Sequence, residues 1–150
     1  HATLWSRDDN LVLAGDQILP SIRSNIGGYA TEPEADPVAD WLEACERLST
    51  IAREDHLVLG GHKLPFTGLP LRLHQLIENH HGALRRLEAH LDTPKSAGDC
   101  FAPLFKRQIG DGEYGLALVE AMAHCQHLWH EGRASRQLSD QGAWLFQTKS

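Results

Sequence analysis

The stretch LVLAGDQILP, residues 11–20, is the most informative part of the sequence. Its first four residues form an apolar run typical of a buried strand, and Gly15 then leads directly to the carboxylate of Asp16. Aspartate has poor strand propensity, and an apolar strand gains nothing by ending in an acid. Layered α/β proteins build their sites where strands end in irregular loops. Asp16 is therefore a candidate site residue, with a simple turn or cap residue as the alternative.

A second stretch ends in the same way. Residues 56–62, HLVLGGH, form another short apolar run that leads through two glycines to His62. Glycines let the backbone turn sharply and let a ligand approach closely. A carboxylate and an imidazole from neighbouring strand ends are ordinary ligands of zinc, iron or manganese. Asp16 and His62 are thus candidate metal ligands, and an ordinary loop histidine is the alternative for His62.

The two stretches LVLAGDQILP and LVLGGHKLPF, separated by a loop and one helix, resemble the second half of a metallo-β-lactamase-fold hydrolase. The resemblance implies that Asp16 bridges two metal ions and that His62 completes the second metal site. The hairpin HATLWSRDDNLVLAGD matches the strand pair that leads into this aspartate. On that match His1 is the second histidine of a GHxxxH-type motif, whose liganding histidine would lie upstream of residue 1. The HxHxDH motif, which supplies most of the family's metal ligands, does not occur in these 150 residues.

The resemblance further implies a metal-dependent hydrolase of ester-like substrates: thioesters, lactones or hydroxyacyl-thioesters. Two divalent metal ions, zinc or else iron or manganese, would lower the pKa of a bound water toward about 7 and so supply hydroxide as the nucleophile. Asn25 and Tyr29 are candidate substrate-binding residues because they lie in the long loop after Asp16, residues 20–36. Two ligands do not make a hydrolase, so we expect this stretch to be inactive by itself.

The predicted fold class is α+β. Residues 1–92 would form half of an αββα sandwich, and residues 93–150 a small appended module. The apolar periodicity predicts strands over 2–6, 10–14 and 56–60, helices over 37–53, 69–91, 96–107 and 113–131, and a hairpin within 133–148. Asp36 should cap the first helix, with Pro37 as its first residue, and Pro103 should kink or split the third.

The first helix can serve as a crossover between two parallel strands, 10–14 and 56–60. Parallel strands end at the same edge of a sheet, so Asp16 and His62 would then converge. If they ligate one centre, the carboxylate oxygen and the imidazole nitrogen should lie within about 5 Å, because each metal bond is about 2.0–2.2 Å long. We expect the exposed edge of such a partial sheet to be covered by a further part of the protein or by a second copy.

Residues 93–150 have the order helix, helix, hairpin, which resembles a winged-helix module, and relatives that cut RNA carry such modules. Nucleic-acid processing or binding is therefore the alternative function. Charge opposes it, because the net charge is −6 and residues 113–131 carry three glutamates and no lysine or arginine. We expect the module to pack on the rest of the protein or to form a homo-oligomer. A third hypothesis is a degenerate metal site in a protein that acts through partners.

Ten histidines exceed what one site needs. His80 falls on the apolar stripe of its helix, so we expect a buried structural histidine there. His124, His127 and His130 recur every three residues along one helix and could clip a metal, but a solvated helix face is the favoured interpretation.

The three cysteines are far apart and form no CxxC motif, which favours a reducing, cytoplasmic setting over a disulfide framework. No apolar run approaches about 18 residues, so we expect no membrane span. The resemblance implies a small-molecule substrate. The sole methionine is Met122, and the sequence opens in strand-like alternation, HATLW. We therefore expect a piece of a longer protein, with a processed terminus or a trimmed tag as the alternative.

Overall fold

The structure is a computed structural model that describes residues 2–149. The chain forms two compact units. The first comprises residues 2–24 and Leu42–Asn79, and the second comprises Asn25–Trp41 and residues 80–149. Each unit thus draws on chain segments that are distant in sequence. The division predicted at residues 92 and 93 stays a prediction, while the α+β class is confirmed by the mixture of helices and small sheets.

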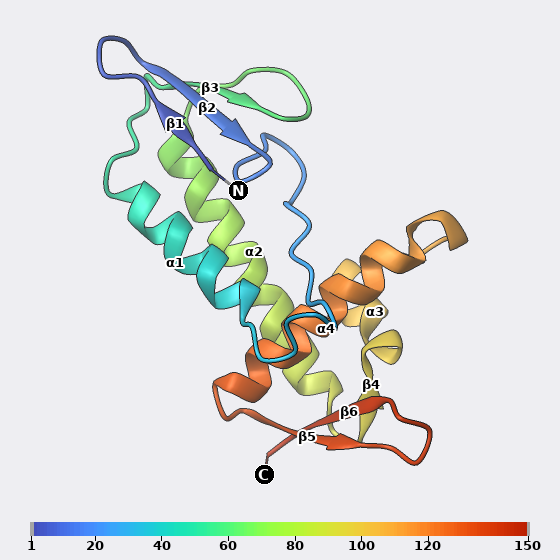
Figure 1. The fold of residues 1–150 in the computed structure, drawn as a ribbon. Helices are drawn as coiled ribbons and strands as arrows, with labels where there is room; N and C mark the ends of the chain where they lie inside the picture. The colour runs from blue at the N-terminus through green and yellow to red at the C-terminus, as the bar shows by residue number, and fades with distance from the viewer. Residues whose placement is uncertain (1, 150) are drawn as a thin grey trace. The chain divides into compact units, whose positions relative to one another are not determined.

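The first unit contains a three-stranded sheet in the order β1-β2-β3 (Figure 1). Strand β1 (Leu4–Trp5) pairs antiparallel with β2 (Leu11–Gly15), and β2 pairs parallel with β3 (Leu57–Gly60). The predicted strand positions and the predicted parallel pairing are confirmed. The first strand is shorter than predicted, because the ladder closes with the Ser6 amide donating to the Leu11 carbonyl and the chain then turns.

This sheet is apolar on both faces. Val12, Ala14 and Val58 on the inner face are fully buried. The opposite face carries leucines, and Leu4 and Leu57 are 65% and 44% exposed. Strands that read as continuous apolar runs are typical of sheets that are covered on both sides. The outer leucine face therefore has the composition of an interior surface.

Helix α1 (Pro37–Ser49) begins as predicted, because the Asp36 side chain accepts a hydrogen bond from the Ala39 amide at 3.0 Å. It ends earlier than the predicted residue 53. The Thr50 and Ile51 amides donate to carbonyls three residues back, which tightens and closes the last turn. Ile51, whose apolar side chain suggested a longer helix, is 53% exposed. Helix α2 (Leu69–His90) agrees with its prediction to within one residue.

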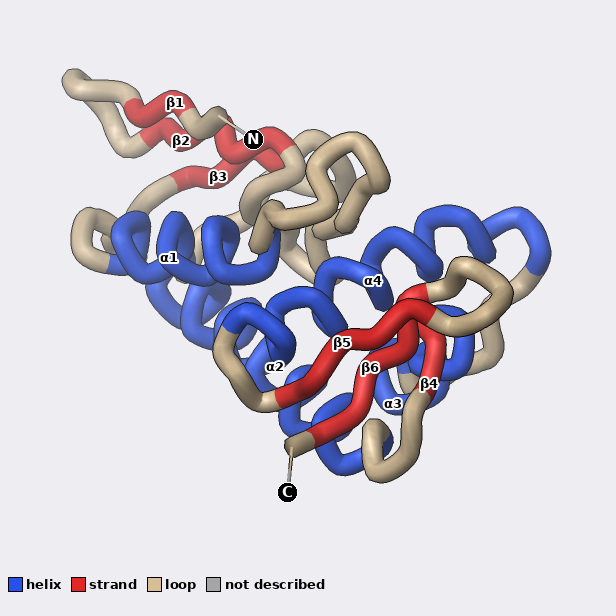
Figure 2. Tube along the Cα trace, turned by 60° about the horizontal axis from the view of Figure 1, so that its bottom comes forward, coloured by secondary structure: helices blue, strands red, loops and turns tan. Residues whose placement is uncertain are grey.

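The second unit contains an antiparallel sheet in the order β4-β6-β5 (Figure 2). Its elements are β4 (Lys95–Ser96), η1 (Ala97–Cys100), α3 (Phe101–Phe105), η2 (Asp111–Glu113), α4 (Tyr114–His130), β5 (Ala134–Leu138) and β6 (Trp144–Thr148). The long fourth helix and the hairpin are confirmed. This sheet has one buried apolar face, which includes Phe146. In contrast to the first sheet, its exposed face carries polar residues, Ser135 and Gln137.

The helix predicted over 96–107 is broken into η1 and the short α3. The 3-10 turn of η1 follows a capping box in which Asp99 accepts hydrogen bonds from the Ser96 backbone and hydroxyl. Lys106, in the left-handed conformation with φ 55°, ends α3. Strand β4 was not predicted, because two residues are too few to show an alternating pattern. Within residues 2–149, no helix is long and apolar enough to cross a membrane.

Candidate functional site

Asp16 and His62 lie together in the first unit. Asp16 follows the last residue of β2, and His62 comes two residues after β3 ends. Because these strands are parallel, the two side chains leave the sheet at the same edge. His62 Nε2 lies 3.4 Å from Asp16 Oδ2, which meets the predicted separation of about 5 Å.

The glycines beside these residues make the close approach possible. Gly15 has φ 52°, in the left-handed region, where a side chain would strain the backbone. The Gly61 amide donates to the Gly15 carbonyl at 2.8 Å and so ties the two strand ends together. A Cβ on Gly61 would collide with Asp16 Oδ1. The glycines of the GD and GGH motifs therefore allow the Asp16 carboxylate to lie against the backbone at Gly61.

The backbone turn at Asp16 is held by a hydrogen bond, but one oxygen of its carboxylate lacks a hydrogen-bond partner within the described residues. The Ser24 hydroxyl donates to the Asp16 backbone carbonyl and fixes the turn. Asp16 Oδ1 is buried and has no hydrogen-bond partner among residues 2–149. A buried carboxylate oxygen without a donor is costly, and a cation is one group that would compensate it. The Asp16 and His62 side chains are 36% and 63% exposed, so the pair remains open to a ligand.

These two donors fit part of a metal site. Zinc, iron and manganese all accept carboxylate oxygen and imidazole nitrogen. Within the described part of the chain, however, no group of three or more histidine, cysteine, aspartate or glutamate side chains could hold a metal ion. His1, placed by resemblance in a histidine motif, lies outside the described residues. Residues 2–149 can therefore contribute two ligands to a centre that needs more.

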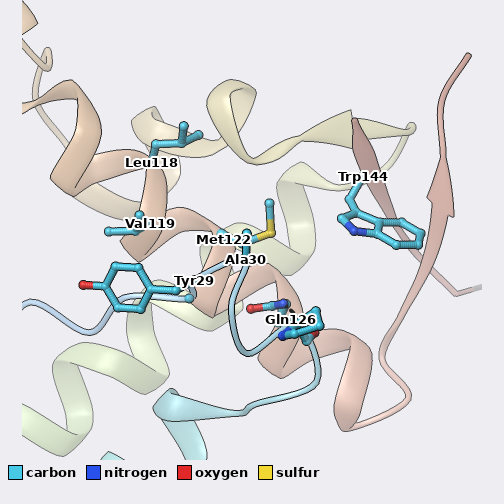
Figure 3. Close-up of a pocket in the computed structure, with 9 residues that line it drawn as sticks. Tyr29, Ala30, Leu118, Val119, Met122, Gln126 and Trp144 are labelled. Carbon is cyan, nitrogen blue, oxygen red and sulfur yellow. Dashed lines mark hydrogen bonds between the residues drawn. The ribbon is translucent and has the colours of Figure 1, made fainter. Parts of the chain in front are cut away.

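Asn25 and Tyr29, the candidate substrate-binding residues, both belong to the second unit. The Asn25 amide lies 3.4 Å from the Leu116 carbonyl oxygen and 3.5 Å from Glu120 Oε2, so it helps to hold the loop on α4. Tyr29 is 54% exposed and lines a cavity of about 320 Å³ (Figure 3). Their role in substrate binding stays a prediction.

The cavity itself was missed at the sequence level. Its walls include Leu118, Val119 and Met122 of α4, with Gln126 one turn further along and Trp144 from β6. Apolar residues on a helix normally indicate core packing, and nothing in their spacing distinguishes a cavity wall from a core. The Gly27-Gly28 pair was the available signal, since paired glycines in a loop mark a close backbone approach.

The expectation of a solvated histidine face on α4 is wrong for two of its three residues. His124 is fully buried, and its Nε2 lies 3.1 Å from Nδ1 of the buried His80, whose burial was predicted. His127 is 5% exposed, and its Nδ1 lies 3.0 Å from Asp36 Oδ2. The physical reason is that α4 packs on more than one side, so a stripe at helical spacing does not face solvent. His130 is exposed.

Comparison with known proteins places this geometry in context. Residues 84–149 match the family model described as metallo-beta-lactamase-like, C-terminal domain. A solved beta-lactamase domain protein from Burkholderia ambifaria is 33% identical over 99% of this chain and 44% of its own, with a TM-score of 0.92. A metallo-beta-lactamase family protein from Thermus thermophilus is 28% identical over 99% of this chain and 45% of its own, with a TM-score of 0.83.

The chain thus spans less than half the length of these two solved structures. None of the curated proteins compared with the chain matches it. The matches confirm the resemblance and the predicted α+β fold class.

Proposed function

Because the chain carries the C-terminal part of the metallo-β-lactamase-like fold, we propose that it contributes Asp16 and His62 to the centre of a metal-dependent hydrolase. The observation that carries this proposal is the convergence of Asp16 Oδ2 and His62 Nε2 at 3.4 Å beside an unpartnered Oδ1. Asp16 thus directs one carboxylate oxygen at His62 and has no hydrogen-bond donor on the other among residues 2–149, which suits a carboxylate that bridges two cations.

The protein's contribution is to hold these donors in place. Gly15, Gly61 and Ser24 fix the turn that presents Asp16, so little reorganisation is needed when a cation binds. The expected ions are two divalent metals, zinc or else iron or manganese, since carboxylate and imidazole suit all three. When bound, such ions polarise a carbonyl and lower the pKa of a coordinated water toward about 7.

The outer face of the β1-β2-β3 sheet supports a larger fold. Leu4, Leu13 and Leu57 are 65%, 42% and 44% exposed on a face that has no polar alternation. A second sheet layered on this face, as in an αββα sandwich, would bury these leucines. The same layer is where the remaining metal ligands would originate. We therefore assign the hydrolytic activity to the complete fold and expect the 150-residue chain alone to be inactive.

The substrates we propose are ester-like: thioesters, lactones or hydroxyacyl-thioesters. Polarisation of a carbonyl by a cation lowers the barrier to attack on any of them. The proposal rests on family resemblance for the substrate class and on this chain's geometry for the ligands. A degenerate metal site in a protein that acts through partners is the outcome expected if neither metal nor hydrolysis is found.

Charge disfavours nucleic-acid binding by the second unit. Helix α4 carries no lysine or arginine. Three arginines of the second unit are paired with glutamates: Arg107 with Glu113, Arg133 with Glu88 and Glu131, and Arg136 with Glu34. Binding to a phosphate backbone rewards cations that are available to it. These ion pairs would have to be broken first, so nucleic-acid processing stays the second choice.

The test uses a protein in which this chain is continuous with the rest of the metallo-β-lactamase-like fold. The variants are Asp16→Asn and His62→Gln, and the matched control is Asp8→Asn, which changes an exposed aspartate in the β1-β2 turn. Metal content and hydrolysis of a thioester, a lactone and a short RNA are measured. We expect each site variant to lose metal and at least about 100-fold in kcat/KM, since outer-shell changes alone cost about 10–100-fold.

The control should keep its metal and its activity. Full metal content and full activity in both site variants would show that Asp16 and His62 are not metal ligands. Cleavage of RNA with no turnover of the thioester or the lactone would favour the nucleic-acid alternative over the ester-like substrates.

A further inference from the structure

The cavity of the second unit is held open by a loop that is fixed on α4. The Gly28 amide donates to the Val119 carbonyl at 2.8 Å, and Gln126 Nε2 donates to the Pro33 carbonyl at 3.0 Å. A Cβ on Gly28 would lie 2.5 Å from Gln126 Oε1 and 3.0 Å from the Ala123 amide nitrogen, so glycine lets the loop come this close to α4. These two hydrogen bonds anchor both ends of the segment 28–33 on α4, so the segment cannot collapse into the cavity.

The side chains at the rim are also held. The Tyr29 ring folds back over Gly27, where a Cβ would lie only 2.7 Å from the ring. The guanidinium carbon of Arg136 lies 4.3 Å from the centre of the Trp144 ring. Figure 3 shows Met122 on the α4 side of the cavity, with Tyr29 and Trp144 on opposite sides of it. The cavity is therefore largely preformed, as ligand sites commonly are.

The lining selects an uncharged, mainly aliphatic ligand. None of the described residues that line the cavity carries a charge, and Leu118, Val119 and Met122 supply aliphatic surface. The polar exception is Gln126, which is 4% exposed. Its Nε2 donates a hydrogen bond to the Pro33 carbonyl, while its Oε1 is buried and has no hydrogen-bond partner among residues 2–149. An unsatisfied acceptor beside an apolar cavity favours a ligand that brings one hydrogen-bond donor.

We propose that this cavity binds an aliphatic chain that ends in a hydroxyl group, with the hydroxyl directed to Gln126. At about 30 Å³ per water-sized group, the cavity holds roughly ten nonhydrogen atoms. The site lies wholly within the second unit and uses neither Asp16 nor His62. Binding at this site therefore goes beyond the proposed hydrolysis and needs no metal.

Met122 provides the readout, because it is the only methionine in the sequence. The 150-residue chain, labelled with methyl-13C methionine, is titrated with 1-hexanol, 1-heptanol and 1-octanol while the Met122 methyl signal is followed by NMR. We expect a saturable shift whose affinity rises about fourfold with each methylene group. No saturable shift with any of the three alcohols would overturn the proposal.

A matched pair of ligands tests the role of Gln126. 1-Heptanol and 1-methoxyhexane have the same number of nonhydrogen atoms, but only the alcohol can donate a hydrogen bond. We expect the alcohol to bind about fivefold more tightly, which is the usual size of one net hydrogen bond. Equal affinities would show that the ligand hydroxyl does not donate a hydrogen bond to Gln126. Octanoate should bind more weakly than 1-octanol, and the reverse order would contradict an uncharged ligand.

A matched pair of variants tests the location. Ala30 lines the cavity, whereas its neighbour Thr31 does not, and both are exposed in the same loop. Ala30→Phe should abolish the Met122 shift, and Thr31→Phe should leave it within about twofold of the unmodified chain. Thermal unfolding followed by circular dichroism checks that both variants fold. Equal binding by the two variants would place the ligand elsewhere, whatever the outcome of the hydrolysis test.

Discussion

Asp16 with His62 in the first unit, and Asp36 with His127 in the second, are two pairs of the same residue types in opposite surroundings. The open pair, Asp16 and His62, has side chains that are 36% and 63% exposed, with 3.4 Å between its closest polar atoms. The closed pair, Asp36 and His127, has side chains that are 18% and 7% exposed, with 3.0 Å between them. Proximity of a carboxylate to an imidazole therefore does not by itself mark a site.

The difference lies in what else each group binds. In the closed pair, Asp36 also caps α1 through the Ala39 amide, and His127 Nε2 lies 3.6 Å from Glu131 Oε2. Both of its groups are satisfied by the protein. In the open pair, Asp16 Oδ1 has no hydrogen-bond partner in residues 2–149. A satisfied pair stabilises the fold, whereas an unsatisfied and accessible pair is prepared for a ligand.

The largest effect should come from breaking the closed pair. Asp36→Ala removes the helix cap and leaves His127 buried without its carboxylate, so we expect the free energy of unfolding to fall by about 3 kcal/mol. Asp36→Asn keeps a capping side chain and should cost less. Urea denaturation provides the measurement, with Asp40→Ala, an exposed change in the same helix, as the control. An Asp36→Ala variant as stable as this control would show that the closed pair has no structural role.

An acid titration should give a smaller effect that also belongs to the second unit. Arg133 contacts both Glu131, which neighbours His127, and Glu88. Its hydrogen bonds hold the pKa of Glu88 below its usual value. A carboxylate with a lowered pKa in the folded state stabilises the protein above its unfolded pKa of about 4.3, and this contribution is lost as pH falls through the folded value.

We therefore expect the free energy of unfolding to decline below about pH 4.3 and the decline to be shallower in Arg133→Gln. Urea denaturation at a series of pH values measures both curves. Parallel curves for the variant and the parent chain would mean that the Arg133 hydrogen bonds do not set the pKa of Glu88.

The smallest effect on stability is expected at the outer leucine face near the open pair. Leu13 and Leu57 are 42% and 44% exposed, so changing both to threonine should alter the free energy of unfolding by less than about 0.5 kcal/mol per site. The double variant should self-associate less in analytical ultracentrifugation, because an apolar patch is removed. Val12→Ala on the buried face is the control and should cost about 1–3 kcal/mol. A larger loss from the leucine changes would show that this face is already covered.

The sequence was sufficient to predict the open pair. Its signals are local: an apolar run, glycine and a polar residue, repeated after a connection long enough for a parallel crossover. The helix cap at Asp36 was equally local, since an aspartate followed by proline indicates a helix start. In both cases the sequence signals are local, which is why the convergence of Asp16 with His62 and the helix cap at Asp36 are confirmed.

The closed pair and the cavity could not be predicted in this way. Both depend on residues 25–36 lying along α4, through contacts between residues 91 and 93 positions apart. The histidines of α4 have helical spacing whether the helix is buried on one side or several. His127 therefore gave the same sequence signal as the exposed His130, and only packing separates them.

Cobalt(II) titration of the 150-residue chain, followed through its backbone amide signals, tests the central claim that Asp16 and His62 act together as ligands. With two protein ligands the binding should be weak, yet paramagnetic broadening should be centred on Asp16, Gly61 and His62. The broadening should disappear in Asp16→Asn and persist in Asp36→Asn. Broadening centred on Asp36 and His127, or broadening that survives in Asp16→Asn, would contradict the account.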